Sequence, residues 1–215
     1  MMPLGDDNSL RKTLPIVTYV LIALNILFFL LELSGGEEFI KQWAFVPRRF
    51  SAEPLADFPT IFTSMFMHAG LMHLAGNMLY LWIFGDNVED HLGKVKYIFL
   101  YLLSGVAATF AQYVFFPDSA IPNVGASGAI AGVLGAYMLF FPGQKVNVLV
   151  GRSIVAMQSV IVIGFWFVMQ LASGAGSLNS TQDTGGVAYM AHIGGFIAGL
   201  AVAFVFRITE SKKFS

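Results

Sequence analysis

A single serine, Ser127, stands among glycines and alanines in the stretch NVGASGAIAG, just where an apolar run begins. A serine inside a transmembrane helix usually hydrogen-bonds to its own backbone and has no other role. It becomes a nucleophile when a histidine within hydrogen-bond reach can take its proton. Which of these applies depends on the polar side chains that the rest of the chain brings to the same place.

The composition is that of an integral membrane protein. Of the 215 residues, 56% are hydrophobic and 12% charged, and the mean hydropathy is +0.71; soluble domains carry about 25% charged residues. The net charge of −1 gives no indication of nucleic-acid binding. The chain has no cysteine, which excludes disulfides, thiolate metal sites and thiol nucleophiles.

Six apolar runs indicate six membrane-spanning helices. All but the fourth are near the roughly 20 residues that a helix needs to cross a bilayer. The sequence therefore predicts an all-α, polytopic membrane protein, a compact bundle forming one domain over residues 1–215. The predicted spans are 16–33, 71–88, 97–116, 127–141, 153–172 and 187–206.

Basic residues set the predicted orientation. With the six spans placed as above, nine of the twelve Lys and Arg residues fall on the side that carries both termini. The other three, Lys41, Arg48 and Arg49, lie in the long first loop. Lys and Arg accumulate in cytoplasmic loops, so both termini are expected in the cytoplasm.

The fourth span is too short to cross the bilayer. Residues 127–141 make a helix of about 22 Å, roughly 8 Å less than the apolar core. With its inner end held by Pro142 and Lys145, the loop that precedes Ser127 lies at membrane depth. Backbone there is tolerated only where it is buried in protein or lines a water-filled cavity. Ser127 is therefore expected below the outer surface, beside water, in a site open to the extracytoplasmic side.

Three further polar residues reach the same depth. His192 lies five residues into the last span, and His73 and Asn77 share one face near the outer end of the second span. Taken singly, a histidine or asparagine between helices is well explained as an interhelical hydrogen-bonding group. Polar groups that converge from three spans indicate a functional site.

Small residues explain how these spans could meet. Gly128 and Gly132 recur at four-residue spacing in the fourth span, as do Gly195 and Gly199 in the sixth. Stripes of small residues let two helix backbones approach closely, in ordinary helix packing as well as in a site. Ser127 and His192 both lie at the outer ends of these stripes. Close packing there would bring the serine oxygen within reach of the imidazole.

No carboxylate is expected beside His192, because the acids of the second span lie at its inner end and the remaining ones are in loops. The residues therefore favour a Ser127–His192 dyad, in which a group other than a carboxylate holds the proton-bearing nitrogen of His192. Asn77, His73 and the backbone N–H of Ser127, at a helix N-terminus, would donate to a developing oxyanion.

Taken together, four motifs resemble the rhomboid family of intramembrane serine proteases over essentially the whole chain. The resemblance implies Ser127 as nucleophile, His192 as general base, and His73, Asn77 and the Ser127 amide as oxyanion hole. It also implies that Gly125 lets the loop approach the substrate carbonyl. The motifs are HAGLMHLAGNM (68–78), GDNVEDHLG (85–93), GASGAIAGVLGA (125–136) and AHIGGFIAG (191–199).

The resemblance also implies partners and a location. Rhomboids cleave single-span membrane proteins within or beside the bilayer, without a metal, a nucleotide or another cofactor. For this chain, that indicates a bacterial or archaeal plasma membrane, no nucleic-acid or nucleotide partner, and substrates with one transmembrane helix.

The chain departs from the family pattern at two places. Members often carry a Trp-Arg pair in the first loop about nine residues before the first histidine, where this chain has Phe58-Pro59-Thr60. Some members have a tyrosine four residues after the nucleophile that stacks on the histidine, where this chain has Ala131. Either another group then orients His192, or its ring is less fixed.

Two other functions stay open. His68, His73 and His192 could ligate a metal ion in a transporter, although no broken helix pair marks an inverted repeat. The chain could also be an inactive relative that binds membrane clients, although both Ser127 and His192 are present. The sequence GASGA is not the G-x-S-x-G elbow of soluble hydrolases, because Ala129 takes the last glycine position.

Overall fold

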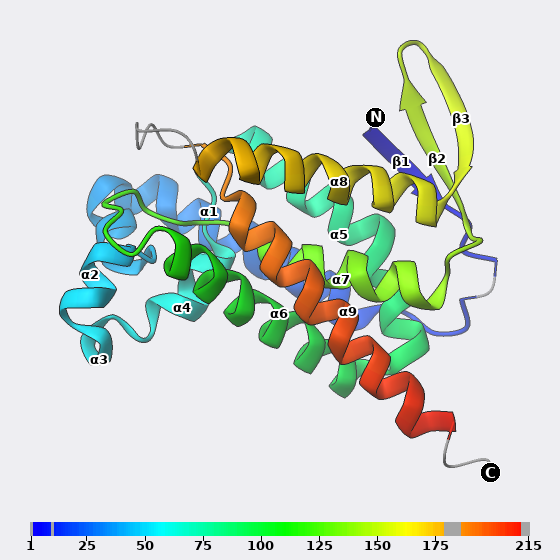
Figure 1. Ribbon diagram of the computed structural model, residues 1–215, viewed down its shortest axis with the longest axis horizontal. Coiled ribbons are helices and arrows are strands. Elements are labelled where there is room, and N and C mark those ends of the chain that lie inside the picture. Colours follow the sequence, from blue (N-terminus) through cyan, green and yellow to red (C-terminus); the bar gives the residue numbers. More distant parts are fainter. Residues whose placement is uncertain (1, 10, 179–185, 212–215) are drawn as a thin grey trace.

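The computed structural model of the protein describes residues 2–9, 11–178 and 186–211. It is mostly helical, and its long helices run side by side (Figure 1). These helices are α1 (Ile16–Trp43), α5 (Leu71–Leu92), α6 (Lys94–Phe115), α7 (Ser127–Phe140), α8 (Ser159–Leu178) and α9 (Tyr189–Ser211). Both termini lie at one end of the bundle.

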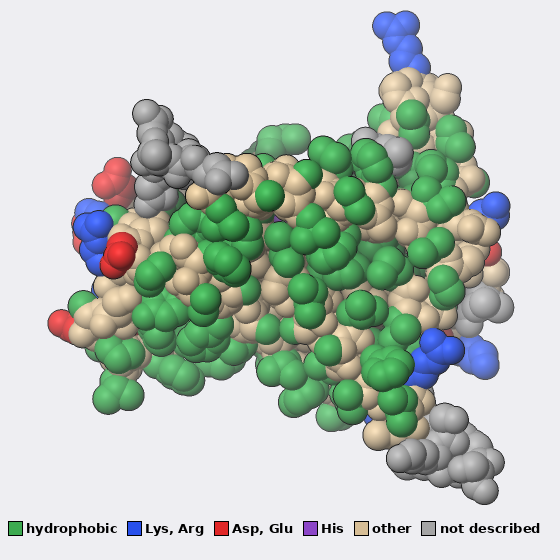
Figure 2. All heavy atoms as spheres, viewed as in Figure 1, with side chains coloured by type: hydrophobic (Ala, Val, Ile, Leu, Met, Phe, Trp, Pro, Cys, Tyr) green, Lys and Arg blue, Asp and Glu red, His purple; other side chains and the backbone are tan. Residues whose placement is uncertain are grey.

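Four of the helices, α1, α6, α8 and α9, are long and apolar enough to cross a membrane. Hydrophobic side chains cover the middle of the visible face, whereas charged side chains gather toward the two ends (Figure 2). A band of apolar surface between charged ends is what a bilayer requires of an integral membrane protein. The count of six spans depends in addition on α5, which carries charges near its C-terminal end, and on the short α7.

Helix α7 forms the centre of the bundle. Its residues from Gly128 to Tyr137 are all buried, and it packs against α5, α6, α8 and α9. It has 14 residues, so it is about 21 Å long. A helix surrounded by other helices is expected to be apolar on every face. In α7 the only hydroxyl groups belong to Tyr137 and to the first residue, Ser127.

Acidic residues near the C-terminal end of α5 hold the start of α1. Both oxygens of the buried Glu89 accept backbone N–H groups, from Val17 at 2.9 Å and Thr18 at 2.8 Å. Asp90 accepts the N–H of Thr13 at 2.7 Å, and Asp86 pairs with Arg11. The N–H groups of Val17 and Thr18 lie in the first turn of α1 and have no acceptor within that helix, and the carboxylates also favour the positive end of its dipole. The stretch GDNVEDHLG is thus a structural joint between α1 and α5.

The prediction of an all-α fold missed a three-stranded antiparallel sheet at the end that carries the termini. β1 (Met2–Asp6) pairs with β2 (Lys145–Val150), which pairs with β3 (Ser153–Gln158). Gly151, with φ of +63°, opens the two-residue turn between β2 and β3. Hydropathy alone cannot separate a β-branched apolar strand from the start of an apolar helix.

The predicted span 153–172 was therefore wrong at its start. Residues 153–158 form β3, and the helix begins at Ser159, whose N–H donates to the carbonyl of Gln144 at 2.8 Å. The first helix continues beyond the predicted 16–33 to Trp43, with a break at Gly36, where φ is +60°. The last helix begins at Tyr189 rather than 187.

The first loop lies at the opposite end, and Arg49 ties it together. This segment holds α2 (Pro47–Ala52), α3 (Pro54–Asp57), α4 (Thr60–Thr63) and a 3₁₀ turn at Ser64–Phe66. The Arg49 guanidinium pairs with Asp57 at 2.5 Å and donates to the carbonyls of Ala44, at 2.5 Å, and Lys41. An arginine at a different position thus anchors the loop that lacks the Trp-Arg pair.

Candidate active site

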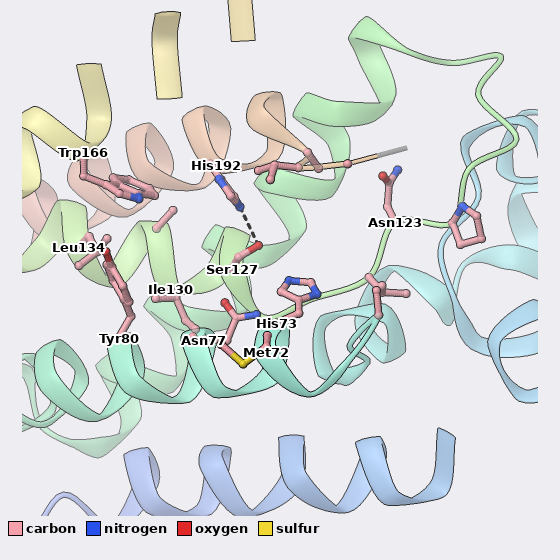
Figure 3. A pocket seen from close by; sticks show the side chains of 18 of the residues that line it. Met72, His73, Asn77, Tyr80, Asn123, Ser127, Ile130, Leu134, Trp166 and His192 are labelled. Atoms are coloured by element: carbon pink, nitrogen blue, oxygen red, sulfur yellow. Dashed lines mark hydrogen bonds between the residues drawn. The ribbon is translucent and has the colours of Figure 1, made fainter. Parts of the chain in front are cut away.

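Ser127 and His192 meet where the N-terminal ends of α7 and α9 cross. The Nε2 atom of His192 lies 2.8 Å from the Oγ atom of Ser127 (Figure 3). Ser127 is the first residue of α7 and His192 lies in the first turn of α9. This distance is that of a hydrogen bond in which the serine hydroxyl donates to the imidazole.

Glycines allow the two helix backbones to approach this closely. A Cβ atom built on Gly195 would lie 2.9 Å from the carbonyl carbon of Gly128 and closer still to its oxygen. One turn farther on, a Cβ on Gly199 would contact the backbone of Gly132. Helices α7 and α9 are therefore in backbone contact along the stripe of small residues, and this contact positions Ser127 against His192.

His73 and Asn77 face the same space from α5. Together with Ser127 and His192 they line a cavity of about 660 Å³, and all four side chains appear around it in Figure 3. The Nδ2 group of Asn77 is buried and has no hydrogen-bond partner among the described residues. A buried amide donor without a partner is costly unless a ligand supplies the acceptor.

Gly125 brings the loop before α7 against His73. Residues other than glycine rarely adopt its φ of +131°, and a Cβ atom built on Gly125 would lie 2.9 Å from the imidazole of His73. The N–H of Gly125 donates to the carbonyl of Ser64 at 2.9 Å, and that of Asn123 to Phe45 at 2.7 Å. The first loop therefore holds the backbone that leads into Ser127.

Two residues of α8 complete the surroundings of His192, and the sequence reading did not single them out. The indole of Trp166 lies beside the imidazole, with ring centroids 5.9 Å apart and an interplanar angle of 34°. The Nδ1 atom of His192 lies 2.8 Å from Oε1 of Gln170. Trp166 and Gln170 share one face of α8, one turn apart. A polar Gln170 within an apolar helix was the available signal.

His68 does not line the cavity but is buried beside His73. Its ring is buried and meets the ring of His73 edge-on, with centroids 5.1 Å apart. Burial and the neighbouring His73 lower the pKa of His68 to about 4, so its ring is neutral at neutral pH. Among the described residues, no group of three histidines or carboxylates is arranged to hold a metal ion.

Comparison with known proteins gives the family. The Rhomboid domain model matches residues 56–209. Rhomboid protease GluP of Bacillus subtilis is 33% identical over 93% of this chain and 36% of its own length. Rhomboid protein 1, mitochondrial, of Saccharomyces cerevisiae is 27% identical over 92% of this chain and 55% of its own length. Rhomboid protease GlpG of Salmonella newport is 28% identical over 95% of this chain and 68% of its own length.

The chain spans only about a third to a half of the first of these relatives, since it covers 36% of one and 55% of another. The family model, however, matches well over half of this chain. The matched stretch contains Asn77, Ser127, Gln170 and His192. The chain therefore belongs to the rhomboid family.

Proposed function

We propose that this protein is an intramembrane serine endopeptidase that cuts single-span membrane proteins near the outer membrane face. The observation that carries the proposal is the 2.8 Å contact between Ser127 Oγ and His192 Nε2 at the wall of a 660 Å³ cavity. Family membership supports it, because two of the relatives compared above are named as proteases.

In this proposal, Ser127 and His192 act as nucleophile and general base. Oγ attacks the substrate carbonyl while its proton passes to Nε2 of His192. The imidazolium then gives that proton to the leaving amine, and an acyl-enzyme remains on Ser127. A water molecule, deprotonated by the same imidazole, hydrolyses the ester and restores the serine. The cycle needs no metal or nucleotide.

Donors for the oxyanion would come from two helices. The N–H of Ser127 is one of the first N–H groups of α7, which have no acceptor within the helix, and the helix dipole favours negative charge there. The unpartnered Nδ2 of Asn77 and the imidazole of His73 face the same cavity from α5. Donors in place before the reaction stabilise developing charge without reorganising.

The membrane arrangement that we propose has six spans within one domain, with both termini in the cytoplasm of a bacterial or archaeal cell. Helices α5 and α7 join the four long apolar helices. The short α7 is buried from Gly128 to Tyr137, and the irregular backbone that precedes it lines the cavity and hydrogen-bonds to the first loop at Asn123 and Gly125, as backbone at membrane depth requires. Nine of twelve basic residues would then be cytoplasmic. The site would open to the outer side.

Labelling with a fluorophosphonate tests this function directly. The detergent-purified protein should form a covalent adduct at Ser127, located by mass spectrometry, and should cut a single-span substrate in liposomes. Ser127→Ala and His192→Ala should abolish both while leaving the unfolding temperature unchanged. An unlabelled but folded wild-type protein that retains a bound membrane client would instead support the client-binding alternative.

A further inference from the structure

We propose that Gln170 is the third member of the catalytic apparatus: a positioning residue that holds His192 in the tautomer and orientation that serine activation requires. This inference rests on the proposed function. It adds to the Ser127–His192 pair a neutral hydrogen-bond acceptor from a third helix.

The two ring nitrogens of His192 have separate partners. Nε2 lies 2.8 Å from Ser127 Oγ, and Nδ1 lies 2.8 Å from Oε1 of Gln170. A carboxamide oxygen is an acceptor only, so Nδ1 must carry the proton. Nε2 then presents its lone pair to the serine hydroxyl, which is the tautomer that a general base needs. Without the acceptor at Nδ1, the proton could sit on either nitrogen.

Packing of α8 against α9 keeps the amide in reach. Phe167, one turn before Gln170, stacks on Phe196 with centroids 4.2 Å apart and an angle of 20°. Trp166 lies beside both Phe196 and the ring of His192. These aromatic contacts hold the helices together on the His192 side. This packing fixes the position of Gln170. Its hydrogen bond to His192 and that of His192 to Ser127 connect α8, α9 and α7.

A glutamine suits this position better than an acid would. Its neighbours are apolar and aromatic, and an ionised carboxylate between two helices in a bilayer is costly. The neutral amide orients the imidazole without that cost. It also stabilises the imidazolium less than a carboxylate would, so the pH dependence of kcat/KM distinguishes an amide from a carboxylate at this position.

Three variants separate a positioning role from a structural one. Gln170→Leu removes the acceptor at similar size, so kcat and the rate of fluorophosphonate labelling should fall about 10- to 100-fold, the effect of losing one buried hydrogen bond, with KM nearly unchanged. Gln170→Glu restores an acceptor and should recover most of that rate. Met169→Leu, at a half-exposed neighbouring position of α8, is the matched control and should behave as wild type.

The pH profile gives the second readout. A carboxylate beside Nδ1 raises the pKa of the imidazole, so the acid limb of kcat/KM should move to higher pH in Gln170→Glu and stay in place in Met169→Leu. Wild-type rates in a folded Gln170→Leu would overturn the proposal, as would equal losses in both Gln170 variants with an unmoved limb. If Gln170→Leu does not fold, the position of the acid limb of kcat/KM in Gln170→Glu tests the proposal by itself. A wild-type protein that never labels would refute the proposed function instead.

Discussion

Adding one methyl group at Gly195 should separate Ser127 from His192 without changing either residue. In the structure, a Cβ at this position would lie 2.9 Å from the carbonyl carbon of Gly128 and 3.3 Å from Cβ of Ala108. Carbon atoms in contact stay about 3.5–4.0 Å apart. Gly195→Ala therefore requires α9 to move away from α7 by about 0.6–1.1 Å to relieve the carbon contact, and by more to relieve the closer contact with the Gly128 carbonyl oxygen.

A shift of that size that carries His192 away from Ser127 would stretch their 2.8 Å contact to about 3.5 Å or more, where a hydrogen bond is lost. Misplacing reacting groups by about 1 Å can cost 10²-fold in rate. Forcing an extra methyl into a packed interior typically costs about 1–3 kcal/mol. We expect kcat to fall about 100-fold, KM to change little, and the unfolding temperature to drop.

The assay combines substrate cleavage, fluorophosphonate labelling and thermal unfolding in the same detergent. Gly164→Ala on α8 is the matched control, because a Cβ there meets no described atom within 4 Å. Alanine is the better helix former, so this variant should keep its activity and gain up to about 1 kcal/mol. If Gly195→Ala labels at the wild-type rate, backbone contact between α7 and α9 does not position the pair.

Three further predictions follow from the site, the sheet and the substrate. Asn77→Ala should lower kcat by about 10²-fold, the lower end for loss of one oxyanion donor; a change in KM alone would make it a binding residue. Burial raises the pKa of Asp6 despite hydrogen bonds from Tyr137 and Asn87, so folding stability should fall as pH rises above about 4, and Asp6→Asn should flatten that part of a Tm-against-pH curve. Gly or Pro in the outer third of a substrate helix, which weakens it by about 1 or 3 kcal/mol relative to Ala, should increase cleavage near the outer face; cuts mapped to the inner third by mass spectrometry would contradict this depth.

The local sequence was sufficient for what depends on depth along a helix. Apolar runs located the long helices to within a few residues at most ends, because burial in lipid demands long uninterrupted apolar segments. Rise per residue then put Ser127, His192, His73 and Asn77 at one level, and in the structure these four side chains line one cavity. Their catalytic roles stay predictions until the variants are measured.

The sequence did not decide which elements pair across large separations. Strand β1 pairs with residues 140 or more positions away, and no local pattern states that partner. The apolar residues 153–158 suit a strand as well as a helix, and only their pairing with β2 selected the strand. Arg49 likewise anchors the first loop through carbonyls and a carboxylate whose approach depends on how that loop folds.

The surroundings of His192 show the same limit at the site itself. Helix periodicity is enough to put Gln170 and Trp166 on one face of α8, but it does not say which neighbour that face meets. The rotation of α8 about its axis is set by side-chain packing, here the stacking of Phe167 on Phe196, and rotation decides which residue reaches Nδ1. How deep a residue lies along its helix follows from its position in the sequence. Which residues face a neighbouring helix depends on how the side chains of both helices pack.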